Sequence, residues 1–301
     1  MKNLLLFGTT NYGPTLNSSD KLKFQELSKN FKTYVITFGD ENKYIDHNIV
    51  GIKYMKKPKI LFFQYFKFYF INLIAVKNFC VEKNIDIISS KDPISAFIPT
   101  LIKTIFIKDI KIVIEHHGDF LNLLLNQRRF KNNFLIKLLA NFLSNFTYKK
   151  CDLIRGVEEN YTLNLAKKYS KKYITFPAWV DYSNYKIQNL NRKNLVYVGN
   201  IIPRKGVDFL IRSFHEFAQE NNFKEKLLII GDNQNTKYFN ECQKIIKDKN
   251  IENIEFIGKK SPEELSLIYS SSKLLVMASN FEGLPRVLIE SGLCATPSLA
   301  T

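Results

Sequence analysis

Short apolar runs alternate with longer segments of helical period along the whole chain. This alternation is typical of parallel sheets built from strand–helix units, so we predict an α/β fold in both halves. The strands of the first half are expected at Leu4–Phe7, Thr33–Phe38, Ile85–Ser89 and Lys111–Glu115. The helices between them are expected near Asp20–Asn30, Lys59–Lys83 and Pro93–Ile107, with the N-cap of the first supplied by Ser18, Ser19 or Asp20.

The second half repeats the pattern after a break. Its strands are expected at Asn194–Val198, Lys226–Ile230, Ile254–Ile257 and Lys273–Met277. Residues 178–193 are rich in Asn, Tyr and Ser and lack a sustained apolar period, which indicates a linker. We therefore expect one domain over residues 1–177 and a second over residues 194–301. Ligands of open α/β sheets bind beyond the carboxyl ends of the strands, so the residues that follow each strand are the candidates for chemistry.

Charge is divided unequally between the halves. The chain has a net charge of +16, and residues 1–180 hold 28 Lys and Arg against 14 Asp and Glu, which is +14. The remaining residues hold 16 against 14. This excess favours an anionic partner for the first half, such as a membrane surface, a lipid phosphate or a nucleic acid.

The cysteines and the N-terminus indicate a cytoplasmic protein. The four cysteines are far apart in sequence and form no CxxC pair, so neither a zinc site nor a disulfide framework is expected. The apolar run Leu4–Phe7 ends at Gly8 and is too short for a signal peptide, so we expect no export by that route.

The first candidate motif follows the strand Asn194–Val198. Its loop has Gly199 at one end and Gly206 at the other, and it carries Arg204 and Lys205 just before a helix expected to start near Val207. Amide donors and the helix dipole at such a position favour an anion, and the two cations would neutralise a diphosphate. The alternative is an ordinary basic loop between a strand and a helix.

The second candidate motif follows the strand Lys273–Met277. Pro285 suits the first turn of a helix, which would place Glu282 and the amides of Gly283 and Leu284 at its positive end and Glu290 inside it. Eight helical steps would separate the two carboxylates by roughly 12 Å, too far for the paired acids of a glycosidase. The alternative is that Glu282 only caps the helix and Glu290 is solvated.

Together these residues resemble the retaining glycosyltransferases of the GT-B family 4, also called glycosyl transferases group 1. The family signature is Glu, seven residues and Glu, which Glu282 and Glu290 match. It is joined at the expected distances by Pro203–Gly206, Leu228–Asp232 and Phe256–Gly258. The resemblance is strong over residues 194–301 and rests mostly on pattern before them. It implies two Rossmann-like domains whose parallel sheets face across a cleft, with the acceptor on the N-terminal side.

The resemblance also implies a role for each matching residue. Arg204 and Lys205 would hold the donor diphosphate, Glu290 the ribose hydroxyls, and Glu282 with the amides of Gly283 and Leu284 the sugar. The remaining donor-binding positions, in the loops after the strands, are Gly199, Gly231 and Gly258.

A histidine of the first half completes the implied site. His117 follows the strand Lys111–Glu115 in a His-Gly turn like that of the family, and would contact sugar or acceptor as a catalytic residue beside Glu282. The alternative for His117 is a structural role.

The chemistry follows from where charge develops. A departing diphosphate becomes more negative as the anomeric carbon becomes cationic, so fixed cations and helix amides stabilise the transition state. The chain contains no Asp-x-Asp, so we expect neutralisation by side chains, no metal ion and no cofactor beyond the nucleoside-diphosphate sugar as co-substrate.

Three features depart from the family pattern. Asn200 stands where the family usually has Arg, which puts one phosphate contact in question. Ala295 stands where Gly commonly follows the signature helix, and a left-handed Ala there would be strained by on the order of 1 kcal/mol. The sequence stops at Thr301, where family members continue, so we expect a second domain that is incomplete.

Two basic and apolar segments indicate a surface that binds membranes. Residues 60–76 are apolar on nearly every face, but at 17 residues with Lys67 inside they fall short of a membrane span. Together with Leu121–Lys150 they favour helices lying on an anionic interface. The alternative is that both pack on the first sheet. No nucleic-acid motif accompanies them, so we expect no nucleic-acid partner.

The sequence therefore predicts a retaining transferase. It would move a sugar from a nucleoside diphosphate to a glycan or glycolipid acceptor at the inner membrane face, in surface polysaccharide or lipopolysaccharide synthesis. The rival is a shortened, non-catalytic protein that binds a membrane surface or a partner. A nicotinamide-dependent Rossmann enzyme is excluded because Gly8 and Gly13 do not fit GxGxxG.

Overall fold

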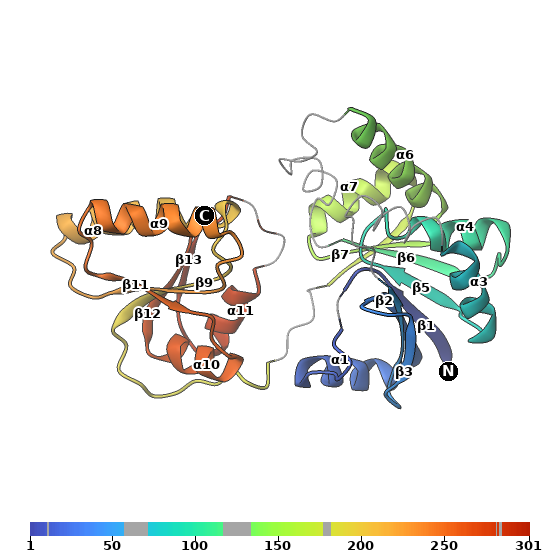
Figure 1. Cartoon of the computed structure of the whole chain (residues 1–301), viewed down its shortest axis with the longest axis horizontal. Coiled ribbons are helices and arrows are strands. Elements are labelled where there is room, and N and C mark those ends of the chain that lie inside the picture. Colours follow the sequence, from blue (N-terminus) through green and yellow to red (C-terminus); the bar gives the residue numbers. More distant parts are fainter. Residues whose placement is uncertain (11, 57–71, 117–133, 177–181, 281, 283–284) are drawn as a thin grey trace. The chain divides into compact units, whose positions relative to one another are not determined.

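The computed structural model divides the chain into two compact units, Met1–Trp179 and Val180–Thr301 (Figure 1). It describes residues 1–10, 12–56, 72–116, 134–176, 182–280, 282 and 285–301, and of residues 135 and 136 only the backbone. The division falls next to the segment expected to be a linker. From residue 182 on, that segment lies against the second unit, where Tyr185 is buried in a core cluster and the Lys186 amide donates to Ser266 Oγ at 3.2 Å.

The described part of the first unit contains an eight-stranded sheet in the order β3-β4-β2-β1-β5-β6-β7-β8. The strands are β1 Lys2–Phe7, β2 Phe31–Gly39, β3 Lys43–Asp46, β4 Gly51–Lys56, β5 Ile87–Ser90, β6 Lys111–His116, β7 Leu153–Gly156 and β8 Lys172–Thr175. All neighbours are parallel except β3 and β4, which pair as an antiparallel hairpin. The four strands expected in this half are confirmed within two residues, whereas the hairpin, β7 and β8 were not predicted.

Helices cover both faces of this sheet. They are α1 Ser18–Ser28, α3 Leu73–Glu82, α4 Phe97–Ile105, α6 Phe134–Lys150 and α7 Glu159–Tyr169. Phe79, Ile102 and Leu143 bring α3, α4 and α6 into one core cluster, and α1 packs through Phe24 into another. Alternate residues of β2 enter the two clusters, so the clusters lie on opposite faces of the sheet.

The N-cap of the first helix lies one residue before the expected caps. Asn17 is the N-cap, and its side-chain oxygen accepts from the Asp20 amide at 2.7 Å. Ser18, Ser19 and Asp20 are therefore the first residues of the helix rather than its cap. The side chain of Asn17 accepts from the amide of Asp20, the third residue of the helix. One side chain satisfies that donor, so no later residue is needed as the cap.

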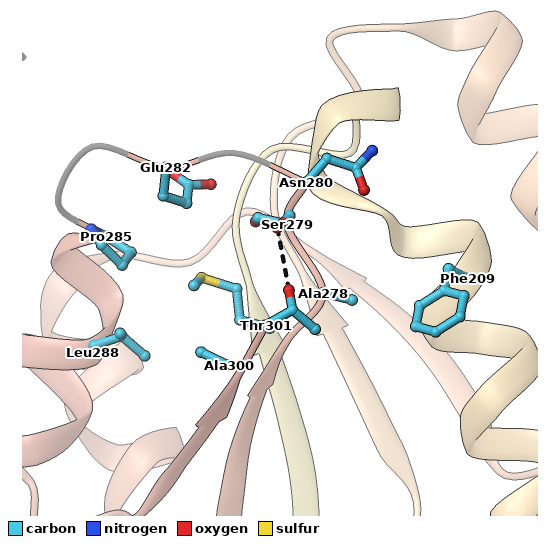
Figure 2. A pocket seen from close by; sticks show the side chains of 10 residues that line it. Phe209, Ala278, Ser279, Asn280, Glu282, Pro285, Leu288, Ala300 and Thr301 are labelled. Carbon is cyan, nitrogen blue, oxygen red and sulfur yellow. Dashed lines mark hydrogen bonds between the residues drawn. The ribbon is translucent and has the colours of Figure 1, made fainter. Parts of the chain in front are cut away.

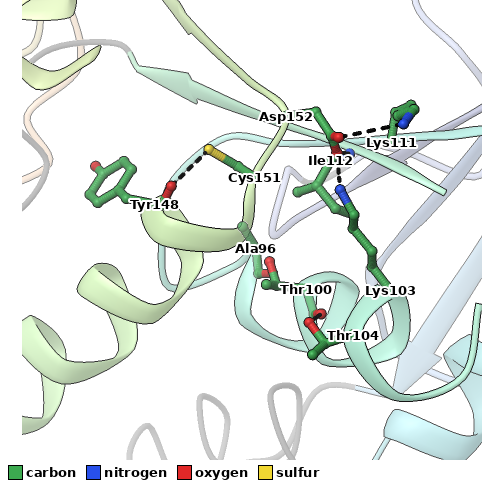
Figure 3. Close-up of polar contacts among 9 residues, drawn as sticks. All are labelled: Ala96, Thr100, Lys103, Thr104, Lys111, Ile112, Tyr148, Cys151 and Asp152. Atoms are coloured by element: carbon green, nitrogen blue, oxygen red, sulfur yellow. Dashed lines mark hydrogen bonds and ion pairs between the residues drawn. The ribbon is translucent and has the colours of Figure 1, made fainter. Parts of the chain in front are cut away.

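Asp152, between α6 and β7, is bound to two further elements of the first unit, α4 and β6 (Figure 3). Its carboxylate pairs with Lys103 of α4 and accepts from the Ile112 amide of β6 at 2.8 Å. Lys111 Nζ lies 3.7 Å from its other oxygen. Burial acts to raise the pKa of Asp152, but these partners outweigh it and lower the pKa, which keeps the carboxylate charged between α6 and β7.

Over its described residues, the second unit contains a five-stranded parallel sheet in the order β11-β10-β9-β12-β13. The strands are β9 Asn194–Val198, β10 Leu227–Ile230, β11 Ile254–Gly258, β12 Ser272–Met277 and β13 Ser298–Ala300. The four predicted strands are confirmed. The strand order reverses between β9 and β12, which makes their carboxyl ends the place where a ligand of such a sheet binds.

Two pairs of helices enclose the second sheet (Figure 1). They are α8 Val207–Glu220 and α9 Thr236–Asp248 on one face, and α10 Pro262–Ser270 and α11 Arg286–Leu293 on the other. The start of α8 at Val207 is the one expected from the sequence. Within the described parts of both units, no helix has the length and apolarity needed to cross a membrane.

Candidate functional site

The loop after β9 is fixed by close backbone approaches. Arg204 and Lys205 lie on a 3₁₀ turn, η2 Pro203–Lys205, that ends at Gly206. Gly206 has a φ of 61°, and a Cβ there would lie 2.1 Å from the Ala278 carbonyl oxygen at the end of β12. Only glycine fits, so the loop lies directly against the neighbouring strand. The Asn280 amide, in turn, donates to the Arg204 carbonyl at 2.9 Å.

Glu282 meets both cations of this turn. Lys205 Nζ donates to Glu282 Oε1, and Arg204 Nη1 lies 3.2 Å from the same oxygen. The side chains of Lys205 and Glu282 are 15% and 17% exposed. Burial acts to raise the pKa of Glu282, but its hydrogen bond to Lys205 and the charges of both cations outweigh burial and hold the pKa below its usual value. Glu282 is therefore an ionised partner of the basic loop rather than a simple helix cap.

A cavity of about 670 Å³ opens beside this carboxylate (Figure 2). Its wall combines the carboxyl ends of β12 and β13 with one side chain of α8 and two residues at the start of α11. The lining residues are Phe209, Met277, Ala278, Ser279, Asn280, Glu282, Pro285, Leu288, Ala300 and Thr301. The Thr301 hydroxyl donates to the Ser279 carbonyl at 3.1 Å, which joins the two strand ends. The cavity thus lies at the carboxyl ends of β12 and β13, and β12 is one of the two strands between which the strand order reverses.

Three glycines mark the carboxyl ends of the neighbouring strands. The Gly199 amide donates to the Ile230 carbonyl at 2.9 Å, and the Gly231 amide donates to the Gly258 carbonyl at 3.1 Å. A Cβ on Gly231 would lie 1.8 Å from the Gly199 carbonyl oxygen, so no larger residue fits there. Together they form a tightly joined edge beside the basic loop.

The same segment of chain matches a known family. Residues 183–301 match the model of "Glycosyl transferases group 1". This stretch contains the basic loop, Glu282 and the cavity. Residues 183–301 form a glycosyl transferases group 1 domain.

Relatives of the chain support this assignment. An uncharacterized glycosyltransferase of Methanocaldococcus jannaschii is 32% identical over 106 residues, covering 35% of this chain and 28% of the relative. The amylovoran biosynthesis glycosyltransferase AmsD of Erwinia amylovora is 31% identical over 143 residues, covering 39% of this chain and 40% of AmsD. The chain spans 28%, 38% and 50% of the length of three curated relatives that it matches.

Solved structures extend the likeness in fold to both units. Sucrose-phosphate synthase from Thermosynechococcus elongatus superposes with a TM-score of 0.76 at 14% identity, covering all of this chain and 81% of the synthase. HepE of Anabaena, solved with UDP and glucose, gives 0.69 at 15%, covering all of this chain and 80% of HepE. The fold is that of the GT-B glycosyltransferases, α/β with one parallel sheet in the group 1 domain and one mainly parallel sheet in the first unit.

Glu290 of the group 1 domain is buried. It lies inside α11, as the sequence predicts, but it is only 5% exposed. Tyr269 Oη donates to Oε2 at 3.3 Å, and Arg286 Nη2 lies 3.7 Å from Oε1. Burial raises the pKa of Glu290 despite these partners. The alternative of a solvated helix residue is therefore wrong, and Glu290 is not among the residues that line the cavity.

Two departures from the family pattern have visible structural partners. Asn200, which stands where the family usually has Arg, donates from Nδ2 to Gln234 Oε1 at 3.2 Å. This hydrogen bond joins the loop after β9 to the loop after β10. Ala295 has a φ of 55°, which is the left-handed conformation anticipated for it. Its amide donates to Gly292 at 2.9 Å and thereby ends α11.

Some expected site residues lie outside the described residues, namely His117, Gly283 and Leu284. His116, the neighbour of His117, is 1% exposed at the end of β6, with Nε2 2.9 Å from Tyr148 Oη. In the part of the chain that the structure describes, no cluster of His, Cys, Asp or Glu could hold a metal ion.

Sequence reasoning missed a polar cluster at the carboxyl edge of the first sheet. Glu115 accepts from Ser89 Oγ at 2.5 Å and from Arg155 Nη1 at 3.1 Å, which joins β5, β6 and β7. Arg155 also donates to the Phe176 carbonyl at 3.1 Å. The available signal was that Ser89, Glu115 and Arg155 stand at or near the ends of neighbouring strands.

Proposed function

We propose that the chain is a retaining glycosyltransferase whose group 1 domain binds a nucleoside-diphosphate sugar. The main support is the pair Arg204 and Lys205, which lies on a turn before α8 and contacts Glu282 at the wall of the cavity. A diphosphate there meets two cations and the amino end of a 14-residue helix. UDP and glucose bound to HepE support the same class of ligand for this chain.

In the proposed reaction the two cations act on the leaving group. As the bond from the anomeric carbon to the diphosphate breaks, Arg204 and Lys205 stabilise the added negative charge. A phosphate oxygen takes the proton of the acceptor hydroxyl on the same face, so the configuration is retained. Glu282, at the cavity wall, holds hydroxyls of the sugar, and Glu290 holds the ribose. We propose that this neutralisation requires no metal ion.

The proposed acceptor is a glycan or a lipid-linked glycan in cell-surface polysaccharide or lipopolysaccharide synthesis. Its support is the likeness to AmsD, whose name assigns it to amylovoran biosynthesis. The proposed location is the cytoplasmic face of a membrane, where the enzyme would be peripheral.

Helix α6 carries an exposed apolar stripe that fits this location. Phe134, Leu138 and Phe142 follow one another at a spacing of four residues and are 74%, 57% and 64% exposed. Lys137, Lys149 and Lys150 lie on the same helix. An apolar stripe with lysines on a unit of strong positive charge is typical of a helix that lies on an anionic bilayer.

Paired lysine variants test the proposed function. Lys205→Ala removes one cation of the basic loop, and we expect it to weaken binding of the preferred nucleotide by about 10- to 100-fold, the scale of one charge-assisted contact. Lys226→Ala is the matched control, because it breaks another lysine–glutamate pair, with Glu255 at 3.1 Å, at the amino edge of the same sheet. Equal affinity of the wild type and Lys205→Ala contradicts the proposed site.

The rival function is a non-catalytic protein that binds a membrane surface or a partner. It is favoured by the α6 stripe taken alone, and it predicts vesicle binding together with nucleotide binding that produces no sugar transfer. A transfer assay with radiolabelled nucleotide sugars and membrane extracts separates the two functions.

A further inference from the structure

The two cations of η2 already have an anion in this chain. Lys205 and Arg204 both contact Oε1 of Glu282, at the wall of the cavity. Both Lys205 and Glu282 are largely buried, while Arg204 is 39% exposed. These three side chains together carry two positive charges and one negative charge. A diphosphate that approaches them meets a net charge of +1 rather than +2.

We propose that Glu282 is an internal counter-ion that competes with the diphosphate of the donor for Lys205 and Arg204. The inference rests on the proposed function and adds a second role to a residue assigned there to the sugar. A carboxylate and a phosphate in contact with the same ammonium group repel each other, and at a partly buried position water screens them little. Binding of the donor therefore either displaces the carboxylate or carries the cost of this repulsion.

The chain offers a contrast that separates this group from an ordinary ion pair. Lys226 and Glu255 bind one to one at the amino edge of the sheet, and both are about half exposed, at 53% and 50%. The Glu282 group has two cations for one carboxylate, is more buried, and lies beside the cavity. Surplus positive charge beside a cavity is typical of a site that binds a further anion.

Competition by Glu282 has a consequence at each end of the reaction cycle. When the donor arrives, the displaced carboxylate is freed from the cations and becomes available to sugar hydroxyls. When the sugar has left, the carboxylate returns to Lys205 and Arg204 and promotes release of the nucleoside diphosphate. A variant without this charge should hold the product more tightly and turn over more slowly.

Glu282→Gln tests the inference, because it keeps the shape of the side chain and removes its charge. The probes are UDP, GDP and ADP, titrated by calorimetry into the full chain. For whichever nucleotide the wild type binds, we expect Glu282→Gln to bind about tenfold more tightly, the scale of one partly buried ion pair. Lys205→Ala should then weaken binding more in the Glu282→Gln background than in the wild type, since Lys205 is no longer shared.

Glu255→Gln is the matched control. It makes the same change in net charge on the same unit, at the amino edge, and should leave affinity within about twofold because salt screens distant charges. Circular dichroism and the melting temperature establish whether each variant is folded. If Glu282→Gln does not fold, the second variant is Glu282→Asp, which keeps the charge and should bind the nucleotide no more tightly than the wild type does.

The outcomes separate the two claims. Equal or weaker binding by folded Glu282→Gln, or an equal gain in Glu255→Gln, overturns the inference and leaves the proposed function standing. Tighter binding by Glu282→Asp overturns it as well. No binding of any of the three nucleotides to the folded wild type contradicts the proposed function, and the inference with it.

Discussion

The exposed stripe on α6 yields a prediction whose size follows from the structure. Replacing Phe134, Leu138 and Phe142 by serine removes three large apolar side chains that are 57–74% exposed. Complete burial of such a side chain contributes about 1.5–3 kcal/mol, so the exposed parts offer roughly 3–6 kcal/mol in total. A helix lying in the interface buries only one face, so we take about half of that sum, roughly 1.5–3 kcal/mol. A value of about 2 kcal/mol corresponds to roughly 30-fold in affinity.

The assay is sedimentation with vesicles of phosphatidylcholine, with and without phosphatidylglycerol. The wild type should bind the anionic vesicles more tightly, and binding should fall as salt rises, because the excess of 14 positive charges in residues 1–180 is screened. The triple serine variant should lose about 30-fold in affinity at low salt. The control variant replaces exposed apolar residues of the second unit, namely Leu190, Phe217 and Leu267.

Two results would refute this reasoning. If both triple variants lose affinity equally, the stripe has no special role. If neutral and anionic vesicles bind the wild type equally well, the positive charge of the first unit does not contribute to membrane binding. Because the serine changes are on exposed positions, they should leave the melting temperature nearly unchanged.

Three further predictions concern stability and metal dependence. Ala295→Gly should raise the free energy of unfolding by about 0.5–1 kcal/mol, because it relieves the positive φ of 55°; chemical denaturation measures this, and Ala218→Gly inside α8 should be destabilising instead. Burial raises the pKa of Glu290 above its ordinary 4.5, so the folded chain holds the proton of this carboxyl more tightly than the unfolded chain does. The free energy of unfolding of the wild type should therefore fall as the pH rises from about 4.5 through the raised pKa. The variant Glu290→Gln should lack this component of the pH profile, and it should also bind the nucleotide more weakly. Nucleotide binding should survive excess EDTA, and its loss in EDTA with recovery in Mg²⁺ would contradict neutralisation by side chains alone.

The sequence predicted the strands of the second unit well, for a physical reason. Each contains a short apolar run, and in β10 the run Leu227–Ile230 is buried or half-buried at every residue; such runs differ sharply from the amphipathic helices around them. The hairpin of the first unit lacked this signal, because β3 is only half buried and its residues Lys43 to Asp46 alternate weakly. Its turn depends on Asn48 at a φ of 64°, with its amide bonded to the Asp46 carboxylate.

The candidate site could be predicted only in part. The sequence placed Lys205 and Glu282 after strands and assigned both to the donor. It did not predict that they pair, because this depends on β9 and β12 being neighbours, a property of sheet order that connects residues 77 positions apart. Nor did spacing predict the burial of Glu290, which comes from packing of α11 against Tyr269 of α10. The left-handed Ala295 was foreseeable because the end of a helix commonly requires that conformation.

The central claim is that the second unit binds a nucleoside diphosphate at its basic loop. Isothermal titration of the 301-residue chain with UDP, GDP and ADP, without added metal, tests it most directly. We expect saturable binding of at least one of them, weakened by Lys205→Ala and unaffected by Lys226→Ala. Absence of heat with all three nucleotides, from a chain that melts cooperatively, would contradict it.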